Sequence, residues 1–226
     1  YEWERTWWKY FGAGRRLFIL LFEKDGAAVG IAPLFLQNER LFGIPVARHL
    51  QFVGVGLSDY LSVIASAGTE EEVLRALVGW LADHPRGWDV FDLEDVAETN
   101  ASFRLLPALL ESRGLRVYRY QGSVCPRIGL PPSEEELMGQ LGPSGSYNLK
   151  RKLKRLHNNY TSEVRLVRKP EDPIDRAIDD FAVIHGGRWK SLGHPSAFDD
   201  PHHRMFHAEA CRKLAGRDWL RIFFLD

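Results

Sequence analysis

Residues 15–37, RRLFILLFEKDGAAVGIAPLFLQ, decide the fold of the first part of the chain. Two apolar runs of strand length flank Asp25-Gly26, a dipeptide typical of the two-residue turn of a β-hairpin. Further strand-like runs alternate with helical patterns after this hairpin. The sequence therefore predicts an α/β fold, with a mixed sheet flanked by helices.

The remaining elements follow from hydrophobic periodicity and from residues that begin or end helices. Thr69 with Glu72 and Ser133 with Glu136 fit capping boxes, and Asn100 or Ser102 can cap another helix. Helices are expected near residues 2–11, 70–81, 102–110, 147–160, 173–191 and 200–215. Strands are expected near residues 49–56, 59–66, 88–96, 115–130, 163–169 and 219–226.

Two prolines before the Ser133 capping box predict a boundary between a first unit, residues 1–130, and a second unit, residues 131–226. The chain starts at Tyr1, without an initiator methionine, and stops at Asp226 directly after a strand-like run. A terminal strand needs a partner for its backbone groups. We therefore expect further sequence, above all beyond residue 226.

Composition gives a weaker guide to function. The formal net charge is +0, so any anion binding must come from a local patch. Cys125 and Cys211 form no metal-type or redox-type pair, which favours free thiols in a reducing cytoplasm. No apolar run approaches the roughly 20 residues that span a bilayer, so no stable membrane insertion is expected.

The order and spacing of several stretches carry a resemblance to a known family. They are YEWERTWW, GIAPLFL, LQFVGVGLSDYLSVIAS, GWDVFDLEDV, RGLRV, CPRIGLP, NLKRKLKRL and RWKSLGHPSAFDDPHHRMF. This order resembles the CelD/BcsL-like acetyltransferases, which are related to the FemAB-type peptidyltransferases. The resemblance implies two tandem GCN5-related acetyltransferase-like domains, the second continuing past residue 226. It also implies acetyl-CoA or another acyl-CoA as cofactor.

Residues 51–56, QFVGVG, match the Gln/Arg-x-x-Gly-x-Gly/Ala pattern of the coenzyme A pyrophosphate loop in that fold. Such a loop must open a helix, because the helix N-terminus attracts the phosphate. Here LSDYLSVIAS follows, and the next helix begins with three carboxylates in TEEE, residues 69–72. We therefore expect the match to be accidental and the first unit to have lost coenzyme A binding. The main binding loop is then expected beyond residue 226.

Acyl transfer to an amine needs a base for the ammonium proton and an acid for the leaving thiolate. Asp59 and Tyr60 follow a glycine-rich strand end, from which they could act as base and acid or orient the acceptor. The alternative is an Asp turn cap beside a half-buried Tyr.

Arg188 and Trp189 match a feature of the family's second domain, so the resemblance implies binding of a carboxylate or phosphate on the substrate. The alternative is an ion pair of Arg188 with Asp179 or Asp180 beside a packed Trp189. His203 and His207 have the i, i+4 spacing of metal ligands, but no Glu base and no third ligand follow the pattern. No metal site is predicted there, and a solvated helix start is expected.

Residues 150–155, KRKLKR, carry five cations, and Lys150, Arg151 and Lys154 are candidate anion-binding residues. They suit nucleic acid, an anionic lipid surface or the phosphates of coenzyme A. The alternative is an ordinary helix that docks Leu149, Leu153 and Leu156 on the core.

The leading hypothesis is an N-acyltransferase that uses acyl-CoA and acts on an amino sugar, a polysaccharide precursor or another small amine. A second hypothesis is a FemAB-like aminoacyl transferase that uses aminoacyl-tRNA. A third is a non-catalytic scaffold in polysaccharide biosynthesis.

Overall fold

The hairpin predicted around Asp25-Gly26 forms the first two strands of the larger sheet in the computed structural model, which describes residues 1–226. Strands β1 (Arg16–Lys24) and β2 (Ala27–Leu41) pair antiparallel. Asp25 and Gly26 have φ angles of 52° and 78°. These left-handed conformations suit a hairpin turn that matches the twist of the strands, so the prediction is confirmed.

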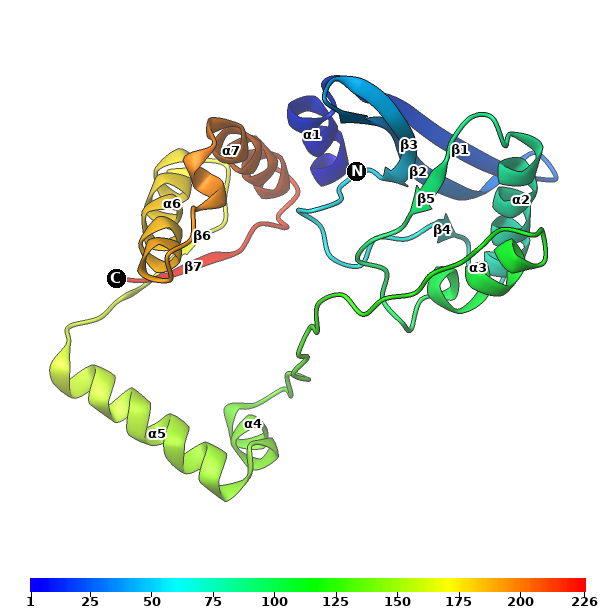
Figure 1. Ribbon diagram of the computed structural model, residues 1–226. Coiled ribbons are helices and arrows are strands. Elements are labelled where there is room, and N and C mark those ends of the chain that lie inside the picture. Colours follow the sequence, from blue (N-terminus) through cyan, green and yellow to red (C-terminus); the bar gives the residue numbers. More distant parts are fainter.

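The larger sheet is mixed, as predicted (Figure 1). Strand β3 (Ile44–Phe52) pairs antiparallel with β2, and β5 (Val90–Asp92) pairs parallel with β3. The short β4 (Ile64–Ala65) pairs with the beginning of β2. The strand order is β1-β2-β3-β5.

Helices α2 (Glu70–Asp83) and α3 (Ala101–Glu111) cover one face of this sheet. The predicted apolar face of α2 is fully buried: Val73, Leu74, Leu77, Val78 and Leu81. The helix lies so close to β2 that a Cβ on Gly30 would come within 2.7 Å of the Val73 side chain. Glycine is therefore required for this contact.

Helix α1 (Glu2–Phe11) covers the opposite face, where Trp7 packs on Phe35 with ring centroids 5.4 Å apart. Leu34 and Phe35 are neighbours in β2, and both are 0 % exposed. Successive strand residues point to opposite faces. Full burial of both residues therefore shows that the centre of the sheet is covered on its two sides.

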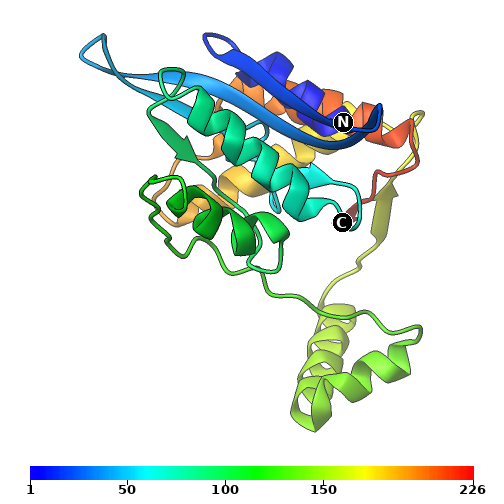
Figure 2. The same ribbon diagram turned by 90° about the vertical axis from the view of Figure 1, so that its right-hand side faces the viewer.

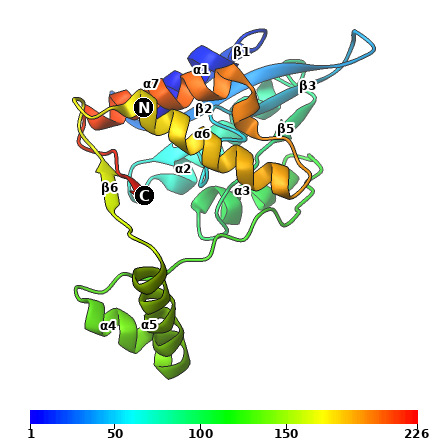
Figure 3. The same ribbon diagram turned by 90° about the vertical axis from the view of Figure 1, so that its left-hand side faces the viewer.

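The C-terminal part builds a second core around a two-stranded sheet, β6 (Val164–Val167) and β7 (Ile222–Leu225). Helix α6 (Ile174–Ser191), the short helix η1 (Ala197–Asp199) and α7 (Pro201–Ala215) pack against it. Helix α7 also lies beside α1 (Figures 1 and 3). Phe206 meets Trp3 there, with ring centroids 4.7 Å apart.

Helices α4 (Glu134–Gln140) and α5 (Gly142–Asn159) stand away from both cores in every view (Figures 1, 2 and 3). Neither helix has a buried residue. The expected docking of Leu149, Leu153 and Leu156 on the core is therefore wrong for this structure, in which α5 packs against α4.

Several local predictions are confirmed, and three are wrong. The strand expected near residues 59–66 is reduced to Ile64–Ala65. Asn100 caps α3, and Ser133 accepts a bond from Glu136 N. Thr69 does not cap α2, because its hydroxyl donates to Ser66 O at 2.9 Å instead. Residues 115–130 form no strand, and all of them except the partly buried Leu115 and Val117 are exposed.

No helix combines the length and hydropathy that crossing a bilayer requires.

Candidate active site

The carboxyl ends of β3 and β5 meet at one edge of the sheet, because these strands run parallel. Binding sites of open α/β sheets commonly lie at such an edge. The chain segments that leave the two strands cross where Leu61 N donates to Asp95 O at 3.1 Å. Tyr60 and Asp95, beside this crossing, have left-handed φ angles of 60° and 57°. Such conformations in residues other than glycine concentrate at functional sites.

The two residues predicted as base and acid, Asp59 and Tyr60, lie at this crossing with exposed side chains. Tyr60 is 49 % exposed, so about half of its surface is buried, as the alternative of a half-buried Tyr expected. The guanidinium of Arg127 lies 5.4 Å from the centre of the Tyr60 ring. Both side chains are thus accessible to a substrate, and Tyr60 has one cationic neighbour.

Further acidic residues, which the sequence analysis did not single out, lie at this edge, and Asp95 is the one close to Asp59. Burial raises the pKa of Asp95, and the charge of Asp59 raises it further. Burial, with the charges of Asp92 and Asp95, also raises the pKa of Glu94. The signal in the sequence was DLED, residues 92–95, at the end of a strand.

Tyr120 completes this acidic edge. Its hydroxyl donates to Asp92 Oδ1 at 3.5 Å, and Gln51 Nε2 donates to Asp92 Oδ2 at 3.3 Å. Burial, followed by the nearby carboxylates, raises the pKa of Tyr120. Carboxylates that raise one another's pKa values attract an ammonium group and become stronger bases. The edge can therefore bind an amine and accept a proton.

The sequence analysis expected that no helix follows the glycine loop after β3, and this prediction is confirmed. Its amides at Val53, Val55 and Leu57 donate to backbone carbonyls. Gly54 instead receives the carboxyl group of Glu4: a Cβ at this glycine would lie 2.4 Å from Glu4 Oε2. A carboxylate already fills the place where a phosphate would need donors.

Coenzyme A also fits poorly at the start of α2, the helix that follows this loop. Glu70, Glu71 and Glu72 occupy its first turn, where their charge repels phosphate. The residues of the first unit therefore do not fit the cofactor that the family resemblance implies.

Arg188 and Trp189 lie near the end of α6. Arg188 is exposed and has no ion pair. The alternative pairing is wrong, because Asp180 binds Arg165 and Asp179 faces Arg204. Trp189 Nε1 donates to His185 Nε2 at 2.7 Å. No contact joins Arg188 or Trp189 to Asp59 or Tyr60.

His203 and His207, on α7, are half-buried against α1, so the expected solvated helix start is wrong for these two residues, whereas Pro201 and His202 are exposed. The His203 ring packs on Phe11, and the His207 ring packs on Trp3. His207 Nδ1 donates to His203 O. Burial lowers the pKa of His207, so the neutral ring is favoured in this interface.

The candidate anion-binding residues Lys150, Arg151 and Lys154 lie on the isolated helix α5 (Figure 2). They are exposed, and none forms an ion pair. Arg151 contacts only the ring of Tyr147, 5.9 Å from its centre. Their charges remain available to an anionic partner.

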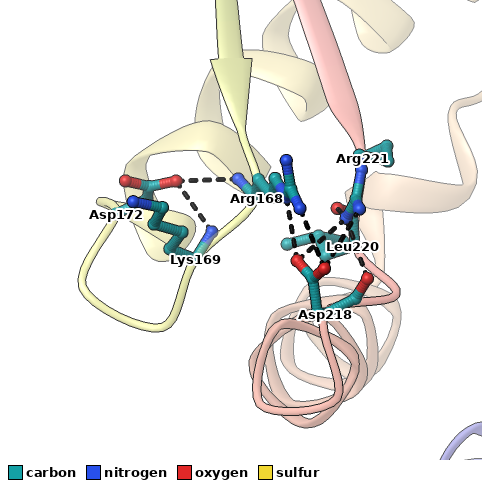
Figure 4. Close-up of polar contacts among 6 residues, drawn as sticks. All are labelled: Arg168, Lys169, Asp172, Asp218, Leu220 and Arg221. Atoms are coloured by element: carbon teal, nitrogen blue, oxygen red, sulfur yellow. Dashed lines mark hydrogen bonds and ion pairs between the residues drawn. The ribbon is translucent and has the colours of Figure 1, made fainter.

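A separate polar cluster joins the ends of β6 and β7 (Figure 4). Arg168 donates to both carboxylate oxygens of Asp218 at 2.8 Å, and Asp172 accepts from the amides of Arg168 and Lys169. Arg168 holds the pKa of Asp218 at about 2. The carboxylates of Asp172 and Asp218 are both bonded within the fold, so we assign this cluster a structural role.

Comparison with known proteins gives one match. Residues 143–226 match the sequence model of the acetyltransferase (GNAT) domain. Neither the curated proteins nor the solved structures gave a match. Domains of the matched family generally bind acetyl-CoA or another acyl-CoA, and the mixed α/β architecture is consistent with their fold. The match supports a general acyl-transfer function for this chain.

Proposed function

We propose that the protein is an N-acyltransferase that uses acyl-CoA and transfers the acyl group to an amine. The observation that carries this proposal is the acetyltransferase (GNAT) domain match over residues 143–226. In this account residues 1–130 form a first unit that binds the acceptor. Residues 131–226 begin a second unit that contributes to cofactor binding. Acceptors of the proposed class are amino sugars, polysaccharide precursors and other small amines.

The acidic edge of the first unit suits the acceptor. Glu94 and Asp95 would hold the ammonium group, and Asp59 would accept the proton that the amine must lose before it attacks. The Tyr60 hydroxyl would donate a proton to the leaving group. When bound, acyl-CoA supplies an acyl group activated as a thioester. Arg188, exposed and without an ion pair, would bind an anionic group of a substrate, with Trp189 beside it.

The test is acetyl transfer to a panel of amines by the full-length protein. We expect Asp59→Asn and Tyr60→Phe to lower kcat/KM by roughly 100-fold, the usual contribution of a general acid or base. Asp83→Asn is the matched control, because Asp83 is exposed at the far end of α2 and forms no ion pair. Full activity in both site variants would contradict these roles.

A second candidate function is aminoacyl transfer from tRNA. The specific observation that favours it is the set of exposed, unpaired cations on α5, a helix without a buried residue. Binding would then weaken steeply with salt, because bound cations displace counterions from phosphates.

The test for tRNA is filter binding across a range of salt concentrations. Replacing Lys150, Arg151 and Lys154 together by Gln should lower the slope of log K against log salt by about 2 to 3. The control replaces Arg86, Arg113 and Arg116, three exposed cations of the first unit. Equal effects of the two triple variants would exclude α5 as the specific site.

If neither acetyl-CoA nor tRNA binds, a non-catalytic scaffold in polysaccharide biosynthesis becomes the best account. A cytoplasmic location belongs to the same proposal. It is supported by the unpaired thiols of Cys125 and Cys211, since oxidising compartments favour disulfides.

A further inference from the structure

A cleft with a volume of about 730 Å³ opens between the N-terminal turns of α2 and α3. It lies beyond the acidic edge described above, and it contains neither Asp59 nor Tyr60. Clefts of this size are typical of sites for small organic molecules. Its lining includes Ser62–Ala65, Glu70, Leu74, Asn100, Ser102, Arg104 and Leu105.

Two helix N-termini meet at this cleft, and the first turn of a helix has amide groups without intrahelical partners. At α3, Asn100 Oδ1 accepts from Ser102 N at 2.8 Å. The amides of Ala101 and Phe103 have no partner in the fold. The cleft therefore has backbone donors, in a place where the helix dipole favours negative charge.

The hydroxyl of Ser102 is a second, independent sign of a ligand. Ser102 lines the cleft and is 2 % exposed, and its Oγ has no hydrogen-bond partner. A buried polar group without a partner is costly, and few occur in native proteins. A ligand group that bonds to this hydroxyl would remove that cost.

The cleft also holds one free charge of each sign. Glu70 and Arg104 form no ion pair, in contrast to the next two residues of α2. Glu71 pairs with Arg75, and Glu72 pairs with Lys24. Glu70 on one helix and Arg104 on the other thus remain available to a ligand that carries both charges.

We propose that this cleft binds a zwitterion of the amino-acid type, such as a free amino acid or a short peptide. Glu70 binds the ammonium group. Arg104, the free amides of α3 and the Ser102 hydroxyl bind the carboxylate. Val63, Leu74 and Leu105 offer apolar surface to an aliphatic side chain. The carboxylates in the first turn of α2 repel the phosphates of coenzyme A, and the same charges favour a ligand with a positive group.

The proposal does not rest on acyl transfer, and it is tested without acyl-CoA. The full-length ¹⁵N-labelled protein is titrated with L-leucine, with L-leucinamide, which lacks the carboxylate, and with N-acetyl-L-leucine, which lacks the ammonium. We expect L-leucine to shift the amide signals of Ser62–Ala65 and Ala101–Arg104. Each derivative should bind about tenfold more weakly, the effect of losing one charged contact.

Variants then assign the two charges. Glu70→Gln should weaken the binding of L-leucine and L-leucinamide but leave the binding of N-acetyl-L-leucine unchanged. Arg104→Gln should weaken the binding of L-leucine and N-acetyl-L-leucine but leave the binding of L-leucinamide unchanged. Glu72→Gln, which alters a carboxylate outside the cleft on the same turn, is the control. Ser102→Ala should raise the unfolding midpoint of the free protein, because it removes an unpaired hydroxyl, and should weaken L-leucine binding.

The proposal is overturned if L-leucine shifts no amide of the cleft at roughly 20 mM, a concentration that detects even weak binding. It is also overturned if the three compounds bind alike, since the cleft would then not recognise the two charges.

Discussion

Gly54 and Glu4 together explain why a sequence that resembles a phosphate loop is not one. Gly54 has a φ of 100°, and the Glu4 carboxyl group lies against its Cα, beside the Ser58 hydroxyl. Burial raises the pKa of Glu4. Context after the loop was enough to predict that the match is accidental. The contact with Glu4 was not predictable, because it joins residues that are distant in the chain.

Gly54→Ala should therefore destabilise the fold more than Gly56→Ala. Both positions have left-handed φ angles, which cost an alanine about 1 kcal/mol. At Gly54 the new Cβ also clashes with Glu4, whereas nothing lies within 4 Å at Gly56. In urea unfolding, we expect the free energy of unfolding to fall by about 2–3 kcal/mol in Gly54→Ala and by about 1 kcal/mol in Gly56→Ala. Equal losses would show that Glu4 does not lie against Gly54.

Glu209 is the main polar contact between α7 and α1. It binds Lys9 and Lys213, and the Tyr10 hydroxyl donates to it at 2.8 Å. The bonds from Lys213 and Lys9 lower its pKa to about 2. A carboxylate whose pKa falls on folding stabilises the fold above its unfolded pKa, near 4.5. This stabilisation is lost as the pH falls from about 4.5 towards 2.

Glu209→Gln should accordingly lower the free energy of unfolding at pH 7 by about 1–3 kcal/mol, since charged hydrogen bonds are lost. The difference from the wild type should shrink as the pH approaches about 2. Denaturant unfolding at several pH values measures both effects. Glu98→Gln, an exposed control without an ion pair, should change stability by less than about 0.5 kcal/mol. A difference independent of pH would contradict the assignment.

At the scale of elements, most helices and the hairpin were predictable, because their signals are local. The stripe of α2, the turn at Asp25-Gly26 and the Asn100 cap all act within a few residues. Residues 115–130 have the composition of strands, yet a strand also needs a partner with free backbone groups. That partner is absent beside them, and no local pattern reveals it.

Helix α5 should be much less stable than α2. It has no buried residue, and most helical stability in proteins comes from packing of an apolar face. We expect its amides to exchange with deuterium at least about 100-fold faster than those in the centre of α2, whose apolar face is fully buried. Hydrogen exchange followed by mass spectrometry measures this. Protection of α5 equal to that of α2 would show that its leucines are docked in solution.

At the scale of the whole molecule, the two cores meet through an aromatic cluster between α1 and α7. Phe206 is 0 % exposed and contacts Trp3 and Phe11. The sequence predicted the helix near residues 2–11 but not its partner, because the residues of α7 that meet it include His203 and His207. Their i, i+4 spacing suggested metal ligands or solvent, and the structure places them against aromatic rings instead.

Phe206→Ala should lower the free energy of unfolding by about 3–5 kcal/mol, the usual loss when a large buried aromatic residue is replaced by Ala. The loss should be accompanied by a change in Trp3 fluorescence, because its ring lies against Phe206. Phe223→Ala, at a residue 66 % exposed on β7, is the control and should cost less than about 1 kcal/mol. Similar losses in both variants would argue against a packed junction of the two cores.

The most direct test of the acyl-transfer account is native mass spectrometry of the full-length protein with acetyl-CoA. The account predicts a one-to-one complex that persists in Gln51→Ala, because the glycine loop of the first unit does not bind the cofactor. Gln51 bonds to Asp92 within the fold, so this variant removes one hydrogen bond. Absence of any complex would contradict acyl-CoA-dependent transfer. Loss of the complex in Gln51→Ala alone would show that the loop is a phosphate loop after all.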